Sequence, residues 1–487
     1  MSKIANRNNW LDYLRSFIIV LVVAHHSSLA YTTFAHFNKD AYILSTHPIV
    51  DAARWKGLDI FEDFNDVFFM SLLYLISGLF VFQSLENKGV KRFIRDRFRR
   101  LFIPFVVGVT VLMLLAYYPA YLLAHGGSLP GTPAMQGVVV PPGGDGTTVP
   151  PGMSGTVGGD GATVLMEMAE TIGLPGEDGT IGTMMVDGLP EMAIPPGIGG
   201  RLGATVLAGM NGRPGTMLPL EMSGLRAYLV DFFTVEAWPV GPPWFIWVLF
   251  LFNLVFAGCY PFIKKGRHKL GLFLAQQKEY PLRIGIAWLL LTWIAYIPFM
   301  WLFGADSWTG WGPFDFQKSR LFLYFCYFLV GVLIGASGLT TGLLSGESHL
   351  VKTGTFWLAG CLTIYALLKL NEASLTDLVS RHRLGQVAAT MIYRSIWVLS
   401  CTFSCIALLT TFKEWIRRSS AWWDSLSANA YGIYLIHYIF VVWCQYGLLT
   451  IHLPAVVKFL ITLVVSLAGS WLVTVLLRRN EVIRKYL

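Results

Sequence analysis

The sequence predicts an all-α polytopic membrane protein with about ten transmembrane helices. Of its 487 residues, 54% are hydrophobic and only 14% are charged, a balance that soluble domains do not have. The mean hydropathy is +0.56. Apolar segments of membrane-spanning length also recur along most of the chain, and the basic residues gather between them.

Ten apolar segments have the length of a membrane helix: residues 15–34, 64–84, 102–124, 243–263, 284–303, 320–338, 353–370, 389–412, 428–447 and 456–477. The first has no small-residue cleavage site and is followed by many more, which indicates a retained helix rather than a signal peptide. Most Lys and Arg residues fall on the side that holds both chain ends, so we expect cytoplasmic termini in a cell membrane. The same distribution accounts for the net charge of +8, and no nucleic-acid partner is expected.

Residues 126–224 differ in composition from both flanks. They contain no Phe, Tyr, Trp, Cys, Lys or His, yet they hold 25 of the 48 glycines. Such a segment cannot supply aromatic packing, which predicts a mobile extracytoplasmic loop without fixed structure. The chain therefore divides into membrane helices at 1–125, this loop, and further membrane helices at 225–487.

The first apolar segment begins with an acid and a base, Asp12 and Arg15, and carries His25 and His26 near its middle. An α-helix turns by about 100° per residue, so Arg15 and His26 project within about 20° of each other, about 16 Å apart along the axis. Ionisable residues at membrane depth are costly and indicate function. A lone histidine there is more often a packing residue, but a neutral imidazole can also take a proton from a hydroxyl. Helical phase favours His26 over His25 for this role.

A dense basic run follows the second apolar segment and contains Arg97, Arg99 and Arg100. Basic runs at a membrane boundary most often set topology and contact lipid headgroups. Arginine also presents paired donors to phosphate, so Arg97 and Arg100 on one helical face are equally a candidate clamp for a phosphorylated donor.

Acidic residues gather where the second apolar segment begins, at Glu62, Asp63 and Asp66. Carboxylates favour the first turn of a helix, so a solvated helix start is one interpretation. The other is that one of them orients an acceptor hydroxyl or a histidine. Ser77, in Ile76-Ser77-Gly78, indicates either close helix packing or a polar pocket.

Near the C-terminus, Tyr434 and His437 lie one helical turn apart. Interfacial anchoring explains tyrosines at such positions well and the histidine less well. The six cysteines have neither metal-site nor disulfide-framework spacing, so no metal is expected.

Several of these segments, taken in order, resemble the acyltransferase 3 family of integral-membrane O-acyltransferases. They are Leu11-Asp12-Tyr13-Leu14-Arg15 with a histidine eleven residues after the arginine, Ile76-Ser77-Gly78, Arg97-Phe98-Arg99-Arg100 before Pro104, residues 243–249 and residues 431–437. The wide loop after the first segment and residues 26–31 resemble the branch of succinyltransferases that act on periplasmic glucans.

The resemblance implies a cytosolic acyl-CoA donor and an extracytoplasmic glycan acceptor, with no permanently bound cofactor. By position, Arg15 and His26 match the family's arginine and histidine, and Arg97 and Arg100 match its paired arginines. We expect His26 to activate the acceptor or accept the acyl group transiently, with Asp12 holding Arg15. The long loop before Trp244 departs from the family's short connection.

Two other functions are alternatives to acyl transfer. A proton-coupled transporter or flippase of a polar solute would use His26 and Arg15 as a relay, although no internal duplication of the kind common in transporters is evident. A membrane scaffold without chemistry would leave the intramembrane ionisable residues unexplained.

Overall fold

The computed structural model describes residues 9–126, 224–234, 238, 239, 241–266, 271, 273, 274, 276–416 and 418–487. The chain forms two compact units, Met1–Gly158 with Val235–Leu487, and Gly159–Thr234. In the second unit the described residues form helix α9 (Gly224–Thr234). The loop expected at 126–224 lies almost entirely outside the described residues, so its predicted lack of structure stays a prediction.

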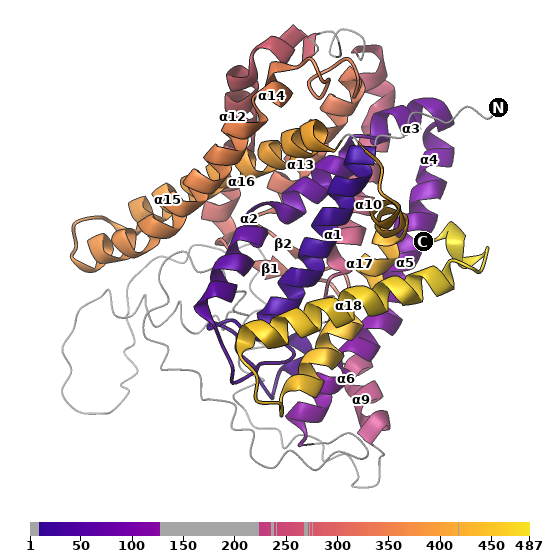
Figure 1. Ribbon diagram of the computed structural model, residues 1–487, viewed down its shortest axis with the longest axis vertical. Helices are drawn as coiled ribbons and strands as arrows, with labels where there is room; N and C mark the ends of the chain where they lie inside the picture. The colour runs from indigo at the N-terminus through magenta and orange to yellow at the C-terminus, as the bar shows by residue number, and fades with distance from the viewer. Residues whose placement is uncertain are drawn as a thin grey trace, which may run out of the picture. The chain divides into compact units, whose positions relative to one another are not determined.

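The first unit is built mainly of helices (Figure 1). Before the loop they are α1 (Asn9–Leu29), η1 (Tyr42–Leu44), α2 (Lys56–Gly78), α3 (Val81–Lys88), α4 (Val90–Arg97), η2 (Phe98–Phe102), α5 (Ile103–Val107), η3 (Gly108–Leu112) and α6 (Met113–Ala124). After it they are α10 (Trp244–Ile263), η4 (Lys264–Gly266), η5 (Gln277–Glu279), α12 (Pro281–Phe303), α13 (Leu321–Ser337), α14 (His349–Lys352), α15 (Gly354–Ser380), α16 (Gln386–Trp415), α17 (Ala421–Leu448), α18 (Ala455–Leu477) and η6 (Ile483–Lys485). Strands β1 (Trp308–Thr309) and β2 (Phe316–Gln317) pair antiparallel between α12 and α13.

Seven helical stretches of the described chain are long and apolar enough to cross a membrane. They are Lys56–Lys88, Val90–Ala124, Trp244–Gly266, Pro281–Phe303, Gln386–Trp415, Ala421–Leu448 and Ala455–Leu477. Helix α13 is apolar but shorter, and α1 and α15 have the length but carry more polar residues. All ten predicted segments fall on helices, so the all-α polytopic fold is confirmed.

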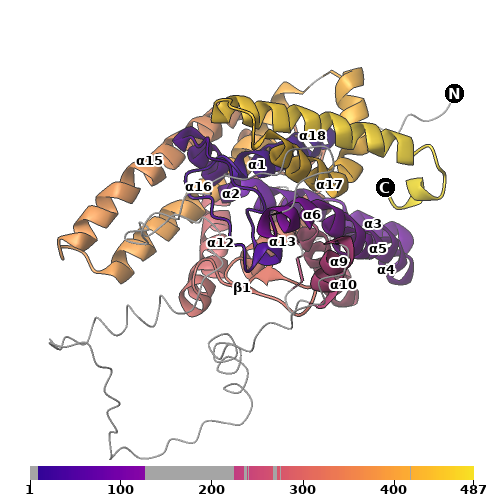
Figure 2. The same cartoon turned by 90° about the horizontal axis from the view of Figure 1, so that it is seen from below.

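Helix α1 lies among the other helices, packed against α2, α16, α17 and α18 (Figure 2). Leu14, Ile18 and Val23 are completely buried, because apolar side chains surround most of its circumference. Polar side chains on α1 are therefore held at fixed positions in the interior, where each needs a polar partner.

Helices α2 and α13 cross closely at glycines. A Cβ atom added at Gly78 would overlap the backbone of α13, and one added at Gly331 would overlap the backbone of α2. Small residues allow such an approach in membranes. The Ile76-Ser77-Gly78 segment thus serves close helix packing, and Ser77 does not line the cavity described below.

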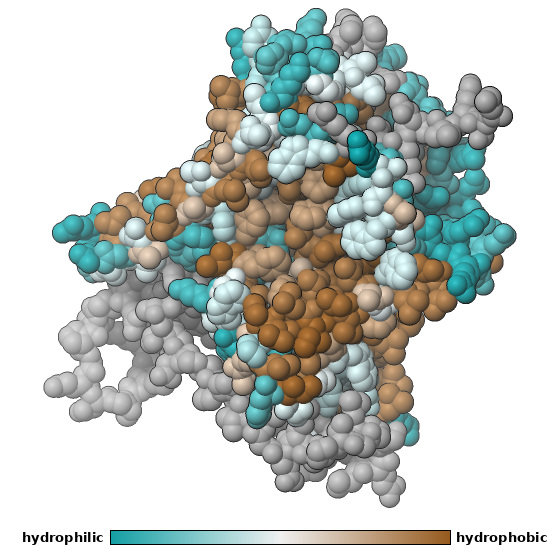
Figure 3. All heavy atoms as spheres, viewed as in Figure 1, coloured by the Kyte–Doolittle hydropathy of each residue, from teal (hydrophilic) through white to brown (hydrophobic). Residues whose placement is uncertain are grey.

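Large exposed apolar side chains occur along α10, α12 and α18. Figure 3 shows hydrophobic side chains gathered over α18 in the middle of one face, with polar side chains mainly toward its margins. This distribution matches helices whose outer faces contact lipid.

Candidate active site

Helix α17 carries a row of polar contacts to α1. From the start of α17 these join Asp424 to the Tyr13 hydroxyl, Ser427 to the Ser16 hydroxyl, His437 to the His26 ring, and Gln445 to the backbone oxygen of His26. Hydrogen bonds between membrane helices contribute about 0.6–2 kcal/mol each. The row therefore fixes the register of the two helices and the position of the two histidine rings.

The partners of His26 and His437 determine which nitrogen of each neutral ring carries the proton. His437 Nδ1 lies 2.6 Å from the Tyr434 carbonyl, and a carbonyl only accepts, so Nδ1 donates and Nε2 keeps a lone pair. His26 Nδ1 lies 2.8 Å from the Val22 carbonyl and 3.3 Å from His437 Nε2. It therefore donates to two acceptors, and His26 Nε2 is the unprotonated nitrogen.

His25 has a different partner from His26. Its Nε2 atom lies 3.7 Å from Glu62 Oε1, and both side chains are buried. Among the described residues, His25 Nδ1 and Glu62 Oε2 have no hydrogen-bond partner. Both histidines line the cavity, so helical phase alone does not decide which of them is the candidate base. Their hydrogen-bond and ion-pair partners distinguish them.

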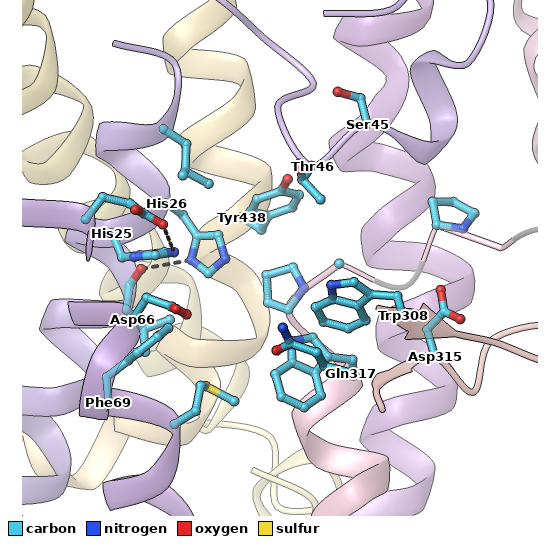
Figure 4. A pocket seen from close by; sticks show the side chains of 18 of the residues that line it. His25, His26, Ser45, Thr46, Asp66, Phe69, Trp308, Asp315, Gln317 and Tyr438 are labelled. Atoms are coloured by element: carbon cyan, nitrogen blue, oxygen red, sulfur yellow. Dashed lines mark hydrogen bonds and ion pairs between the residues drawn. The ribbon is translucent and has the colours of Figure 1, made fainter. Parts of the chain in front are cut away.

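A cavity of about 340 Å³ lies beside the two histidines (Figure 4). Helices α1, α2, α6, α13 and α17 form its wall together with residues from three other segments: Ile43, Ser45 and Thr46; Trp238, Pro239, Gly241, Pro242 and Trp244; and Asp306, Trp308, Asp315, Gln317 and Arg320. Its polar and aromatic side chains are His25, His26, Ser45, Thr46, Phe69, Tyr117, Tyr324, Tyr434, Tyr438, Glu62, Asp66, Asp306, Asp315, Gln317, Arg320, Trp238, Trp244 and Trp308. Figure 4 shows His25 and His26 on one side of the cavity and Trp308, Asp315 and Gln317 on the other.

The three predicted carboxylates of α2 point in two different directions. Glu62 and Asp66 lie four residues apart on one helical face and line the cavity. Asp63 points instead to α15, where its Oδ2 lies 2.6 Å from Lys369 Nζ. The Arg320 guanidinium lies 2.7 Å from Asp66 Oδ2. Glu62 is therefore the predicted carboxylate that lies in the cavity without an Arg or Lys partner among the described residues.

Tyr434 and His437, the predicted pair on α17, have separate positions. Tyr434 lines the cavity, and its hydroxyl donates to the Pro242 carbonyl. His437 is completely buried behind His26. It therefore acts on the cavity through His26.

Arg15 and Asp12 lie away from the cavity. Arg15 Nη2 is 3.1 Å from Asp12 Oδ1, and the Arg15 side chain is 47% exposed. The neighbouring Ser16 meets Ser427, ten residues before His437 on α17. This end of α1 is therefore about 15 Å from the histidine pair along the helix axis.

Along the helix axis, the basic run lies between Arg15 and the pair formed by His26 and His437. The hydroxyl of Tyr431 donates to the Arg100 carbonyl at 2.6 Å, in the π-helical segment η2, whose altered backbone pattern leaves carbonyls open to outside donors. Tyr431 is six residues from His437, which corresponds to about 9 Å. In the described chain, Arg97, Arg99 and Arg100 form no ion pair, and Arg99 and Arg100 are exposed.

Sequence reasoning missed the cavity residues from the segment between α12 and α13. Asp306, Trp308, Asp315 and Gln317 come from one polar and aromatic loop, and Arg320 directly precedes α13. Arg320, at the edge of an apolar segment, was the available signal. Burial raises the pKa of Asp315 to about 6, and the Arg394 guanidinium lies 3.6 Å from Asp306.

No group of three or more His, Cys, Asp or Glu residues in the described chain could hold a metal ion. The chemistry that these residues offer is proton transfer at His26 and hydrogen bonding along the cavity wall.

Membrane-spanning helices that enclose an unprotonated imidazole nitrogen, carboxylates and aromatic rings in one cavity define an integral-membrane enzyme site for a polar substrate. The chain belongs to the family described as "Acyltransferase domain", whose model matches residues 8–475. It is therefore a multi-pass membrane acyltransferase.

Part of the chain is similar to curated bacterial proteins. Glucans biosynthesis protein C of Salmonella schwarzengrund (strain CVM19633) is 30% identical over 110 residues, which are 23% of this chain and 26% of the relative. The protein of the same name from Salmonella agona (strain SL483) is 31% identical over 110 residues, with the same coverage. The chain thus matches about a quarter of the length of these relatives, and they agree with the predicted branch of the family. No solved structure matches the chain.

Proposed function

We propose that the protein transfers an acetyl or succinyl group from cytosolic acyl-CoA to a hydroxyl of an extracytoplasmic carbohydrate, with both chain termini in the cytoplasm. The observation that carries this proposal is the position of His26 at the cavity with its Nδ1 within hydrogen-bond distance of the Val22 carbonyl and His437 Nε2, an arrangement that leaves Nε2 as the nitrogen without a proton. Family membership supports acyl transfer, and the name of the similar proteins supports a glucan as acceptor.

In this proposal His26 Nε2 takes the proton of the acceptor hydroxyl while the hydroxyl oxygen attacks the carbonyl carbon of the thioester. The new C–O bond forms, the C–S bond breaks, and the proton passes from His26 to the departing CoA sulfur. The Val22 carbonyl and His437 Nε2 both accept from His26 Nδ1, so they stabilise the positive charge that His26 carries between these steps. General base catalysis of this kind contributes about 10²–10⁴-fold in rate.

The donor is proposed to bind from the end of the helices where α1 begins. Arg97, Arg99 and Arg100 hold the CoA phosphates, since they form no ion pair in the described chain and guanidinium groups pair with phosphate oxygens. Arg15, held by Asp12, lies about 15 Å from the histidines along the helix axis and orients the donor. The acyl thioester then extends along α17 toward His26.

The acceptor is proposed to enter the cavity from the opposite end of the helices. Glu62 has one oxygen near His25 and one without a hydrogen-bond partner in the described chain. A buried carboxylate oxygen without a donor is costly, and an acceptor hydroxyl supplies that donor. Asp66 and Tyr434 complete this part of the wall, whereas Asp63 and Ser77 lie outside it.

The test combines a membrane assay with glycan analysis. Membranes that contain the protein should move label from acetyl-CoA or succinyl-CoA into carbohydrate, and mass spectrometry of glycans from cells with and without the protein should show the matching mass increment. Failure with both donors, together with proton-coupled solute uptake that needs no acyl-CoA, would replace the proposal with the transporter hypothesis.

A further inference from the structure

The cavity wall opposite the histidines is built from residues that the proposed chemistry does not use. Strands β1 and β2 bring Trp308 opposite Gln317 in register, and the Trp308 ring meets Trp244 edge to face at 5.5 Å between centroids. Gln317 Nε2 donates to the Ala305 carbonyl, and Trp247 donates to the Asp315 carbonyl at 2.9 Å. These bonds hold the loop in one conformation, which is what a binding surface requires.

Three buried polar atoms of the cavity have no hydrogen-bond partner in the described chain, and one of them is His25 Nδ1. The other two are Arg320 Nε and Glu62 Oε2, on residues that are 3% and 5% exposed. Arg320 Nε can only donate a hydrogen bond, and an ionised Glu62 can only accept one. A hydroxyl group both donates and accepts, so a ligand with several hydroxyls satisfies both atoms.

The charges of this wall favour a neutral ligand. Asp66 and Asp306 face Arg320 and Arg394 in ion pairs, so these arginines offer little free positive charge to an anion, and Asp315 in its ionised form repels anions. The positive charge of Arg320 is already neutralised by Asp66 at 2.7 Å. Phosphate groups of the donor are therefore disfavoured here, in contrast to the exposed arginines of the basic run.

The aromatic side chains select the shape of the ligand. Trp238, Trp244 and Trp308 line the cavity, and an indole face packs well against a flat apolar surface. A pyranose ring offers such a surface in its C–H groups and carries hydroxyls around its edge. The volume of about 340 Å³ lies at the low end of the range of about 300–1,000 Å³ for small-molecule sites, so only one or two rings fit.

We infer that Trp308, Asp315 and Gln317 form a subsite for a neutral pyranose residue of the acceptor glycan, opposite His26, which acts on its hydroxyl. The inference rests on the proposed function for the identity of the acceptor. Asp315 Oδ and Gln317 Oε1 accept hydrogen bonds from ring hydroxyls, while Trp308 covers one face of the ring. Arg320 Nε and Glu62 Oε2 bind hydroxyls on the side of the ring nearer the histidines.

The experiment measures sugar binding in the absence of any acyl donor. The full-length protein in nanodiscs is titrated with β-linked glucose pentasaccharides of 1,2, 1,3, 1,4 and 1,6 linkage, and binding is followed by calorimetry. We expect at least one pentasaccharide to bind, with Trp308→Ala weakening binding at least tenfold and Trp308→Phe retaining most of it. The matched control is Trp311→Ala, because Trp311 lies in the same loop, is 82% exposed and does not line the cavity.

The outcomes separate this inference from the proposed function. Absence of binding for all four linkages overturns the subsite, as does unchanged binding in both Trp308→Ala and Asp315→Asn proteins that keep the wild-type elution profile. If Trp308→Ala fails to fold, Asp315→Asn and Trp308→Phe carry the comparison. Pentasaccharide binding without acyl transfer removes the proposed function and leaves the subsite. If the protein transfers acyl groups and the acceptor KM is the same in wild type and Trp308→Ala, the proposed function stands and the subsite is overturned.

Discussion

The charged residues of the basic run and those of the cavity differ in how they are held. Arg99 and Arg100 are exposed and form no ion pair among the described residues. Arg320, in contrast, is buried, and its guanidinium lies 2.7 Å from Asp66. A free exposed charge is available to a mobile anionic ligand but is screened by salt. A buried paired charge keeps its geometry and interacts through a medium of low dielectric.

This difference indicates a division of work between the two regions. The basic run suits capture of a charged donor, where strength depends on ionic strength. The cavity suits chemistry, where His26 and His437 must keep one arrangement of protons. Variants in the basic run should therefore change the KM for acyl-CoA, whereas variants at His26 and His437 should change kcat.

The largest expected effect is at His26. His26→Gln removes the unprotonated Nε2, and acyl transfer should fall by about 10²–10⁴-fold in kcat, because the proposed general base is lost. The KM for acyl-CoA should stay near the wild-type value. Transfer from labelled acyl-CoA into carbohydrate by membranes with matched expression measures both.

The matched control for this variant is His349→Gln. His349 is a half-exposed histidine that pairs with Glu279 at 3.1 Å and does not line the cavity, so the control should transfer at the wild-type rate. Undiminished transfer by His26→Gln would remove His26 from the mechanism.

The second effect is at His437, which sharpens the role of fixed protons in the cavity region. His437→Leu removes an acceptor from His26 Nδ1 and should lower kcat about ten- to hundredfold, since a hydrogen bond to a charged group contributes about 1.5–3 kcal/mol. His437→Gln retains an acceptor oxygen and should recover much of this loss. Steady-state kinetics of the two variants, with a full pH profile of kcat, distinguishes this from simple loss of packing. Equal losses in both variants, without a change of pH profile, would point to packing alone.

Much of the fold was predictable from the sequence because it depends on local patterns. Each apolar segment specifies its own helix within a membrane, and all ten predicted segments lie on helices. The candidate role of His26 followed from residue chemistry and helical phase, both of which are local.

The cavity was less predictable because it depends on which helices are neighbours. The pairing of His26 with His437 needs α1 beside α17, and the opposite directions of Asp63 and Asp66 follow from the positions of Lys369 and Arg320. The loop that carries Asp315 reaches the cavity only through the packing of α12 and α13. A single sequence holds no local signal for these contacts.

The third effect tests the basic run. Arg97→Ala and Arg100→Ala should each raise the KM for acyl-CoA about tenfold at low salt with little change in kcat, because they remove a charge-assisted contact to phosphate. The increase should shrink at high salt. Arg95→Ala is the matched control, as Arg95 is an exposed arginine of the same run outside the proposed clamp. A fall in kcat at constant KM would contradict donor binding by the basic run. It would also contradict the division between donor capture in the basic run and chemistry in the cavity.

The smallest effect concerns Asp315, the cavity carboxylate whose pKa burial raises to about 6. Above this pH the ionised carboxylate accepts hydrogen bonds from acceptor hydroxyls, whereas the protonated form loses part of this capacity. The acceptor KM of the wild type should therefore rise a few-fold as pH falls from 7 to 5, and Asp315→Asn should lack this step. The ratio of the two profiles isolates Asp315, because the two proteins differ only at this residue.

The same pKa gives a prediction for stability with a defined sign. The pKa of Asp315 rises from its usual value of 3.8 to about 6 in the folded protein, so the folded state binds this proton more tightly than the unfolded state does. The contribution of the protonated carboxyl to stability is complete below about pH 4 and is lost as pH rises through about 6. Asp315→Asn, which never ionises, should therefore gain thermal stability relative to wild type between pH 4 and pH 7. A Tm difference that stays constant across this range would show that Asp315 is solvated like the exposed charges of the basic run.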